Sequence, residues 1–199
     1  ELVSHCRQAL AAIVPEAAPE MTVDTVQNPD FRVGSALSVI AARNVLEADD
    51  EVLLMDADVL YDVRMLARLM DSAHSNVVLM DRDVDAGDAE PVKLAVARGQ
   101  LVGFDKQLPA DLSYDTLGES VGFFRLTPAV ASDLVAACEQ VSSADADAPY
   151  EHALRNVLLA GPEAFGFEDV TGLPWIEIDY PQDVDRAVDD ILPRLEALA

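Results

Sequence analysis

Positive charge is scarce in this chain: its 199 residues hold 13 Lys plus Arg against 37 Asp plus Glu, for a net charge of −24. This excludes a basic surface for nucleic acid, because phosphate binding needs clustered positive residues. No apolar run reaches the roughly 18 residues that a bilayer-spanning helix needs, so we expect neither membrane insertion nor a secretory leader. Hydrophobic residues still make up 51% of the chain, enough for the core of one folded domain.

Cysteine and lysine are also rare. Cys6 and Cys138 stand far apart with no C-x-x-C spacing, which indicates two reduced thiols in a cytoplasmic protein rather than a zinc or redox site. Lys93 and Lys106 are the only lysines, and Asp outnumbers Glu 24 to 13. This composition is typical of halophilic proteins, in which salt screens the repulsion between acidic side chains. An ordinary acidic cytoplasmic protein is the alternative.

Helical and strand-like periodicities alternate along the chain. We expect helices over residues 2–13, 35–46, 63–72, 129–141 and 149–159, and from residue 181 onward. We expect strands over residues 21–26, 51–56, 76–80, 92–96, 100–104, 120–126, 165–170 and 175–178, with a hairpin turn at Arg98-Gly99. The predicted fold class is α/β: a three-layer sandwich around a mixed, mostly parallel central sheet, with a β-hairpin insert.

The segment over residues 51–56 is a nearly continuous apolar run that ends in carboxylates, which is typical of a buried parallel strand. Asp56 and Asp58 therefore stand where open α/β sheets bind ligands, and two such carboxylates can hold Mg²⁺ that also contacts phosphates. An acidic loop is the alternative, because Asp-x-Asp arises easily by chance in an Asp-rich chain. We interpret the same spacing at Asp81-Arg-Asp83 as a solvated loop.

A second acidic segment is Trp175-Ile-Glu-Ile-Asp179. Alternation along a short strand places Trp175, Glu177 and Asp179 on one side, where Asp179 could complete the metal shell begun at the first strand end. Lys93 and Lys106 lie on and just beyond the expected hairpin. Because lysine is a compact cation, both are suited to a phosphate or phosphonate.

These segments occur together with others in a set order. In the sequence they are Asn28-Pro-Asp-Phe31, Ser38, Asp58-Val-Leu-Tyr61, Val92-Lys93, Lys106, Gly118-Glu-Ser-Val-Gly122, Tyr150-Glu151 and Trp175-Ile-Glu-Ile-Asp179. The set resembles the nucleotidyltransferases of the sugar-phosphate type, which have a Rossmann-like fold. Within them the chain is most similar to cytidylyltransferases that act on phosphocholine or on small phosphonates such as 2-aminoethylphosphonate. The resemblance covers nearly the whole chain.

The resemblance implies a reaction and a role for each matching residue. The acceptor oxygen would attack the α-phosphorus of CTP and release pyrophosphate, with no general base. Mg²⁺ would be held by Asp58 and Asp179, with Asp56 as a further candidate, and Lys93 would contact the nucleophile. The acceptor pocket would be shaped by Lys106, Glu119, Tyr150, Glu151, Trp175 and Glu177, which suit an amine or trimethylammonium head group. Asn28 and Ser38 would contribute to nucleotide binding.

One feature of the family is missing. Its members open with a strand and a Gly-rich loop that hold the triphosphate, and this sequence has no such loop. We therefore expect residues 1–199 to form a single nucleotidyltransferase-like domain that lacks its first βαβ portion, either as a fragment of a longer protein or through loss of the nucleotide-binding half. A metal-dependent nucleotide-sugar glycosyltransferase, which would use Asp56 and Asp58 together, and a non-catalytic remnant are the alternatives. The nucleobase, the acceptor and a homodimer are left open.

Overall fold

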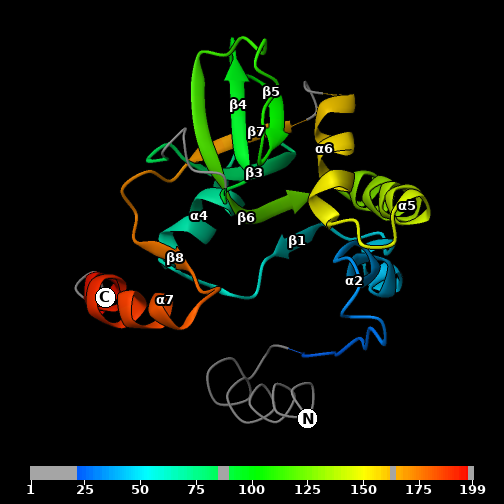
Figure 1. Ribbon diagram of the computed structural model, residues 1–199, viewed down its shortest axis with the longest axis horizontal. Helices are drawn as coiled ribbons and strands as arrows, with labels where there is room; N and C mark the ends of the chain where they lie inside the picture. Colours follow the sequence, from blue (N-terminus) through cyan, green and yellow to red (C-terminus); the bar gives the residue numbers. More distant parts are fainter. Residues whose placement is uncertain (1–21, 85–89, 162–164, 197–199) are drawn as a thin grey trace.

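The computed structural model describes residues 22–84, 90–161 and 165–196. Its main sheet has six strands: β5-β4-β6-β3-β7 in order, with β1 pairing on β6 outside this path (Figure 1). A separate two-stranded sheet pairs β2 with β8. The strand bounds are β1 Val52–Met55, β2 Val59–Tyr61, β3 Asn76–Asp81, β4 Lys93–Ala97, β5 Gln100–Asp105, β6 Thr116–Leu126, β7 Phe165–Asp169 and β8 Trp175–Glu177.

The helices follow the predicted segments closely. Their bounds are α2 Ala36–Ala41, α3 Arg43–Leu46, α4 Val63–Asp71, α5 Pro128–Ala144, α6 Tyr150–Ala160, α7 Pro181–Arg186, a π-helical turn η2 Ala187–Ile191 and α8 Leu192–Glu196. The helix expected over residues 35–46 divides at Ala42 into α2 and α3. The helix expected over residues 2–13 lies outside the described residues. The strand expected over residues 21–26 is wrong for its described part, because residues 22–26 form no strand. No helix in the described part of the chain is long and apolar enough to cross a membrane.

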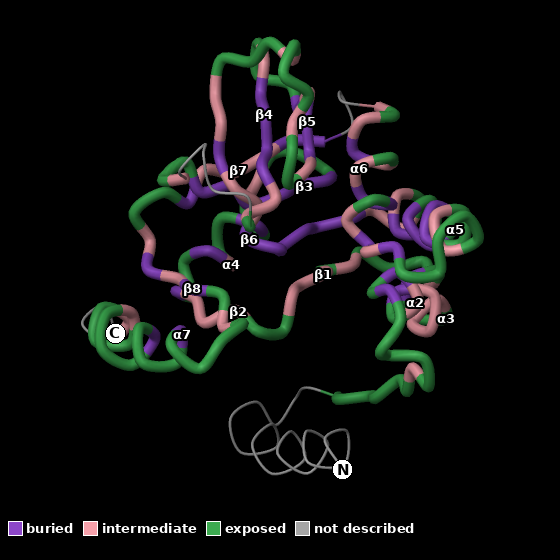
Figure 2. Tube along the Cα trace, viewed as in Figure 1, coloured by how far each residue is buried: buried purple, intermediate pink, exposed green. Residues whose placement is uncertain are grey.

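Helices cover both faces of the main sheet, so the predicted three-layer sandwich is confirmed. Alternate residues of β3 belong to two separate cores: Val77 and Leu79 pack with Met65 and Leu69 of α4, while Val78 and Met80 face the helices α2, α5 and α6. Figure 2 shows the buried backbone concentrated in β3, β4 and β6 and in the inward turns of α5. The sheet is thus the rigid support on which the remaining elements are placed.

The prediction of a mostly parallel sheet is wrong for the described strands. Only β3 and β7 pair in parallel, whereas β1–β6, β3–β6, β4–β6 and β4–β5 are antiparallel. Likewise β1 is no fully buried parallel strand: it pairs antiparallel to β6, and Leu53 is 40% exposed. Apolar content reveals that a segment forms a strand, but it does not reveal the direction of its neighbour.

The long strand β6 organises this arrangement. Its first half, residues 116–119, pairs with β4, and its second half, residues 123–126, pairs with β1. Gly122 lies between the two halves with φ of +77°, a conformation that favours glycine. One long strand therefore pairs with the hairpin strand β4 on one side of Gly122 and with β1 on the other. The hairpin itself turns at Arg98 and Gly99 as predicted, both with positive φ.

Candidate functional site

The short ribbon β2–β8 brings two distant carboxylate segments together. Val59 lies opposite Glu177, and the Ile178 backbone N–H donates to the Asp58 carbonyl at 2.9 Å. Asp58 therefore faces the end of β8. Carboxylate oxygens of Asp58, Glu177 and Asp179 lie within 4.8 Å of one another, and all three residues are exposed. We call these three residues the carboxylate triad.

The triad has the chemistry of a divalent-cation site. Partial burial, together with the nearby charges of Asp179, Asp58 and Asp56, raises the pKa of Glu177 to about 7, while Lys106 acts in the opposite direction. Carboxylate oxygens are the protein ligands that Mg²⁺ prefers, and a cation would relieve the repulsion between these groups. The structure thus places Asp58 and Asp179 together, as the sequence predicts. It adds Glu177, which the resemblance places in the acceptor pocket.

Asp56 is not one of the three carboxylates of the triad, and it is hydrogen-bonded to Tyr150. The Tyr150 hydroxyl donates to both carboxylate oxygens of Asp56, at 2.7 and 3.0 Å. Burial is the main cause that raises the pKa of Asp56 to about 6, against the lowering effect of the Tyr150 hydrogen bond. Burial beside Asp56 also raises the pKa of Tyr150. The Tyr150 hydroxyl therefore clamps Asp56, and the metal-ligand role of Asp56 and the ring-face role of Tyr150 stay predictions.

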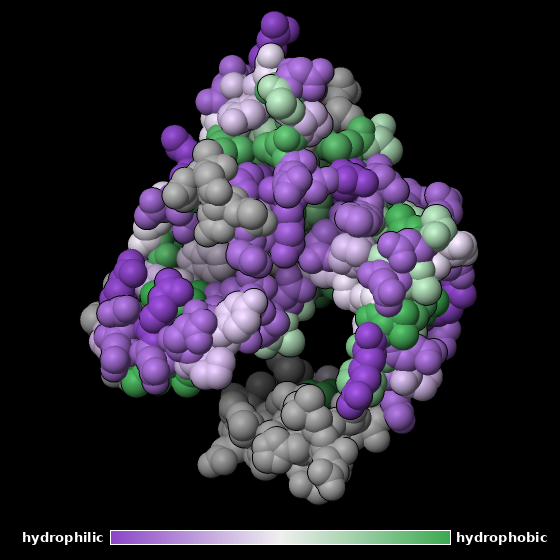
Figure 3. Space-filling model, in the orientation of Figure 1, coloured by the Kyte–Doolittle hydropathy of each residue, from purple (hydrophilic) through white to green (hydrophobic). Residues whose placement is uncertain are grey.

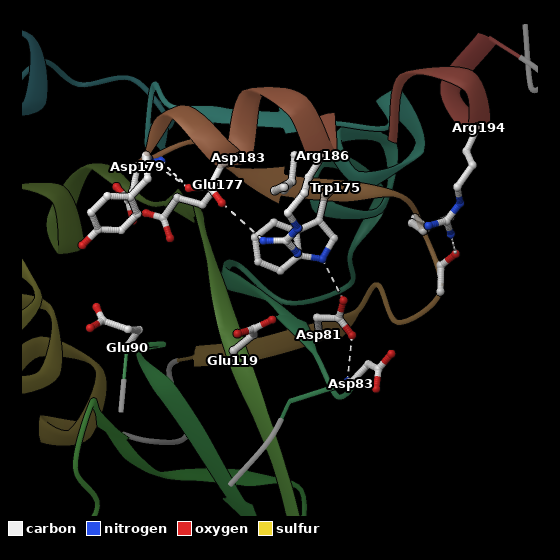
Figure 4. Close-up of a pocket in the computed structure, with 14 residues that line it drawn as sticks. Asp81, Asp83, Glu90, Glu119, Trp175, Glu177, Asp179, Asp183, Arg186 and Arg194 are labelled. Carbon is white, nitrogen blue, oxygen red and sulfur yellow. Dashed lines mark hydrogen bonds and ion pairs between the residues drawn. The ribbon is translucent and has the colours of Figure 1, made fainter. Parts of the chain in front are cut away.

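Two adjoining hollows are lined by Glu177 and Asp179 of the triad, whereas Asp58 is not among the lining residues of either. The first, of about 500 Å³, reaches from Asp81 to α7, and the second, of about 240 Å³, reaches from Asp56 to Lys106. They share five lining residues: Glu90, Glu119, Trp175, Glu177 and Asp179. Figure 4 shows Glu119 and Glu177 near the Trp175 ring, with Asp179 and Glu90 farther to one side. Figure 3 shows that hydrophilic residues dominate the face it displays. Carboxylates outnumber cations in this lining, in which Arg186 and Arg194 belong to the first hollow and Lys106 to the second.

The Trp175 ring is fixed by a residue that the sequence analysis set aside. Its Nε1–H donates to Asp81 Oδ2 at 2.7 Å, and Asp81 is only 7% exposed. The interpretation of Asp81 as part of a solvated loop is therefore wrong, because Asp81 is the last residue of β3. The signal was present in the sequence: Asp81 ends an apolar run as Asp56 does.

The remaining predicted site residues lie around this centre. Lys106 and Glu151 line the second hollow. Lys93, Asn28 and Ser38 are not among the residues that line either hollow. Lys93 is 5% exposed and donates from Nζ to the Lys106 carbonyl at 3.2 Å. Asn28 and Ser38 contact each other, with Asn28 Nδ2 donating to Ser38 Oγ at 3.0 Å. The roles of Lys93, Asn28 and Ser38 stay predictions.

Helices on both faces of a mixed sheet, with the β2–β8 ribbon beside it, form a Rossmann-like α/β fold. The structure matches that of the inositol-1-phosphate CTP transferase from T. maritima with a TM-score of 0.69 and 19% identity, covering 94% of this chain and 72% of that one. This match shows the fold.

Two curated relatives agree with this class. One is the bifunctional IPC transferase and DIPP synthase of Rubrobacter xylanophilus, 27% identical over 193 residues and 96% of this chain. The other is the CMP-5'-(3-aminopropyl)phosphonate synthase of Streptomyces rubellomurinus, 26% identical over 191 residues and 94% of this chain. The chain spans 39% of the length of the first and 30% of the second. No protein-family model matches. The resemblance to cytidylyltransferase-type nucleotidyltransferases is thereby confirmed.

Replacing Gly122 with Ala tests the clamp on Asp56. A Cβ at Gly122 would lie 2.1 Å from Asp56 Oδ2, at a φ of +77°. Gly172→Ala is the matched control, because its φ is +85° and a Cβ there would meet nothing within 4 Å. We expect Gly122→Ala to lower the free energy of unfolding by about 1–3 kcal/mol more than the control, measured by urea denaturation. Equal losses would mean that Asp56 is not held against Gly122.

The raised pKa values of Asp56 and Glu177 predict a pH dependence of stability in metal-free protein. Both values, about 6 and about 7, exceed the ordinary 3.8 and 4.5. The two protonated carboxyl groups therefore stabilise the folded state fully below about pH 4, and this stabilisation is lost as the pH rises through both pKa values. We expect the free energy of unfolding to fall from about pH 5 to about pH 8, and Glu177→Gln to reduce this fall.

The control for this measurement is Asp133→Asn, which also removes one negative charge, from an exposed residue of α5. It should leave the pH dependence close to that of the unmodified chain. If Glu177→Gln and Asp133→Asn changed the dependence equally, general repulsion rather than the triad would be its cause.

Proposed function

We propose that this chain belongs to an Mg²⁺-dependent cytidylyltransferase that transfers CMP from CTP to a small phosphonate or phosphorylated alcohol. The observation that carries the proposal is the carboxylate triad, set between two hollows at the edge of a nucleotidyltransferase fold. The two curated relatives support it, since the name of one contains CMP and a phosphonate. In this role Asp58, Glu177 and Asp179 would bind the metal ion.

When bound, Mg²⁺ would neutralise phosphate charge and hold the reacting groups in place. The residues of the chain position these groups and contribute charge. The ionised acceptor oxygen attacks the α-phosphorus of CTP, the bond from that phosphorus to the bridging oxygen breaks, and pyrophosphate leaves with the electron pair. No side chain has to remove a proton, because the attacking oxygen already carries the charge. Catalysis then depends on alignment of the two substrates.

The lining of the cleft supports an acceptor with a positively charged group at one end and an anionic group at the other. Glu90 and Glu119 line both hollows and Glu151 lines the second, where carboxylates attract an ammonium group. Lys106 is the lysine that lines the second hollow, and we assign it to the phosphonate or phosphate. Lys93 remains a candidate for the same contact, because its Nζ donates to the backbone carbonyl of Lys106 and so lies close to that residue. An aminoalkylphosphonate combines the two features.

The composition of the triad disfavours the glycosyltransferase alternative. That interpretation needs Asp56 and Asp58 as a pair of metal ligands, whereas the group of carboxylates whose oxygens lie within 4.8 Å of one another contains Asp58 but not Asp56. The triad instead joins Asp58 to the Trp175–Asp179 segment, as the cytidylyltransferase interpretation requires.

From composition, we further propose a salt-adapted cytoplasmic protein that does not bind nucleic acid.

Asp179→Asn, made in the whole protein to which this chain belongs, tests the proposed function. Loss of one metal ligand should lower the rate of pyrophosphate release from CTP and 2-aminoethylphosphonate by at least about 100-fold, because metal stabilisation of phosphate charge contributes several kcal/mol. Asp185→Asn, an exposed carboxyl on α7, makes the same change in charge outside the triad and should retain the activity. Unchanged turnover in Asp179→Asn would contradict the proposal.

A further inference from the structure

We propose that Asp81 is a positioning residue that gives the acceptor site its preference for a cationic group, by fixing the Trp175 ring as a wall of the cleft. The inference rests on the proposed function for its substrate class. The hydrogen bond between the two side chains is a feature of the structure itself.

The Asp81 carboxylate is unusually well buried for a charged group, at 7% exposure. Burial of a carboxylate is costly unless its oxygens accept hydrogen bonds. Oδ2 accepts from Trp175 Nε1 at 2.7 Å, and Oδ1 accepts from the Asp83 backbone N–H at 2.9 Å. Each carboxylate oxygen therefore accepts a hydrogen bond, and the two bonds hold the carboxylate in one orientation at the end of β3.

Trp175 is held at two points. Its backbone lies in β8 opposite Tyr61 of β2, and its ring edge is bonded to Asp81. The ring also packs against the core beside α4. Figure 4 shows the indole edge directed at Asp81, with Glu119 on the same side and Glu177 and Asp179 beyond the ring. Without the Asp81 bond, only packing would fix the ring.

A fixed indole suits a cationic ligand. The face of a tryptophan ring attracts ammonium groups, and this attraction depends on the position of the cation over the ring. The negative charge of Asp81 at the indole N–H reinforces the negative character of the ring, and Glu119 lines the same two hollows. Asp81 thus acts through Trp175 and itself needs no contact with the acceptor.

Asp83 provides a matched control. It is exposed and lines the first hollow together with Asp81 and Trp175. Asp83→Ala removes the same charge from the same hollow, but it retains the backbone N–H that Asp81 accepts. A difference between Asp81→Ala and Asp83→Ala therefore reports the bond to Trp175 rather than the net charge of the cleft.

Trp175 is the only tryptophan of the chain, so its fluorescence reports directly on the ring. We expect Asp81→Ala to lower the fluorescence anisotropy of Trp175 and to increase its quenching by acrylamide, while Asp83→Ala resembles the unmodified chain. Asp81→Asn, which keeps the shape but can accept only with its carbonyl oxygen, should give a smaller change in the same direction. This variant tests the same bond if Asp81→Ala fails to fold.

The second measurement is calorimetric binding of 2-aminoethylphosphonate and of ethylphosphonate, which lacks the amine, both with Mg²⁺ present. We expect Asp81→Ala to reduce the preference for the amine by about 5- to 30-fold, the range of a partly desolvated cation–π contact, and to leave ethylphosphonate binding unchanged. In a Trp175→Phe background, which has already lost the N–H donor, Asp81→Ala should add little.

The outcomes separate this inference from the proposed function. An unchanged amine preference or an unchanged ring anisotropy in Asp81→Ala and Asp81→Asn would overturn the role of Asp81 alone. If the unmodified chain bound neither phosphonate, the proposed acceptor class would fail and the inference with it. If it bound both equally well, the acceptor site would stand and the cationic preference would be refuted.

Discussion

The antiparallel register of β2 and β8 is the constraint on which the candidate site depends. Three carboxylates lie within 4.8 Å of one another, although like charges at such distances repel. Their side chains stay together because Val59 is paired with Glu177 and the Ile178 N–H is bonded to the Asp58 carbonyl. Backbone hydrogen bonds thus hold an arrangement that the side chains alone would disfavour. The divalent cation that we propose for this site would offset this repulsion.

Few cations are available in this chain, so neutral donors bind two of the carboxylates around the cleft. The Tyr150 hydroxyl donates to Asp56, and the Trp175 indole donates to Asp81. Asp183, which is 8% exposed, also has a cationic partner: its Oδ2 accepts from the Tyr180 backbone N–H at 2.9 Å and from that of Asp179 at 3.3 Å, and its Oδ1 accepts from Arg186 at 3.3 Å. Asp183 therefore supports the segment that carries Asp179. The neutral donors add no positive charge to the cleft, which suits the cationic ligands that we propose for it.

Sequence patterns predict the elements of this fold better than their pairing. Periodicity locates the helices α4 to α6 and the hairpin turn at Arg98, because these depend on nearby residues. Strand direction depends on which strands become neighbours, and the pairing of β1 with β6 joins residues about 70 positions apart, which no local pattern reveals. In the site, the resemblance brings Asp58 and Asp179 together, but the clamp on Asp56 and the bond from Trp175 to Asp81 join residues 94 positions apart. Such contacts follow from the tertiary structure alone.

Anomalous X-ray diffraction from crystals of the chain soaked in Mn²⁺ tests the central claim most directly, because it locates the ion without any assumption about substrate. We expect one Mn²⁺ coordinated by oxygens of Asp58, Glu177 and Asp179, with Asp56 still bonded to Tyr150. An ion bound by Asp56 in place of Glu177 or Asp179, or an empty triad in crystals that hold Mn²⁺ elsewhere, would contradict it.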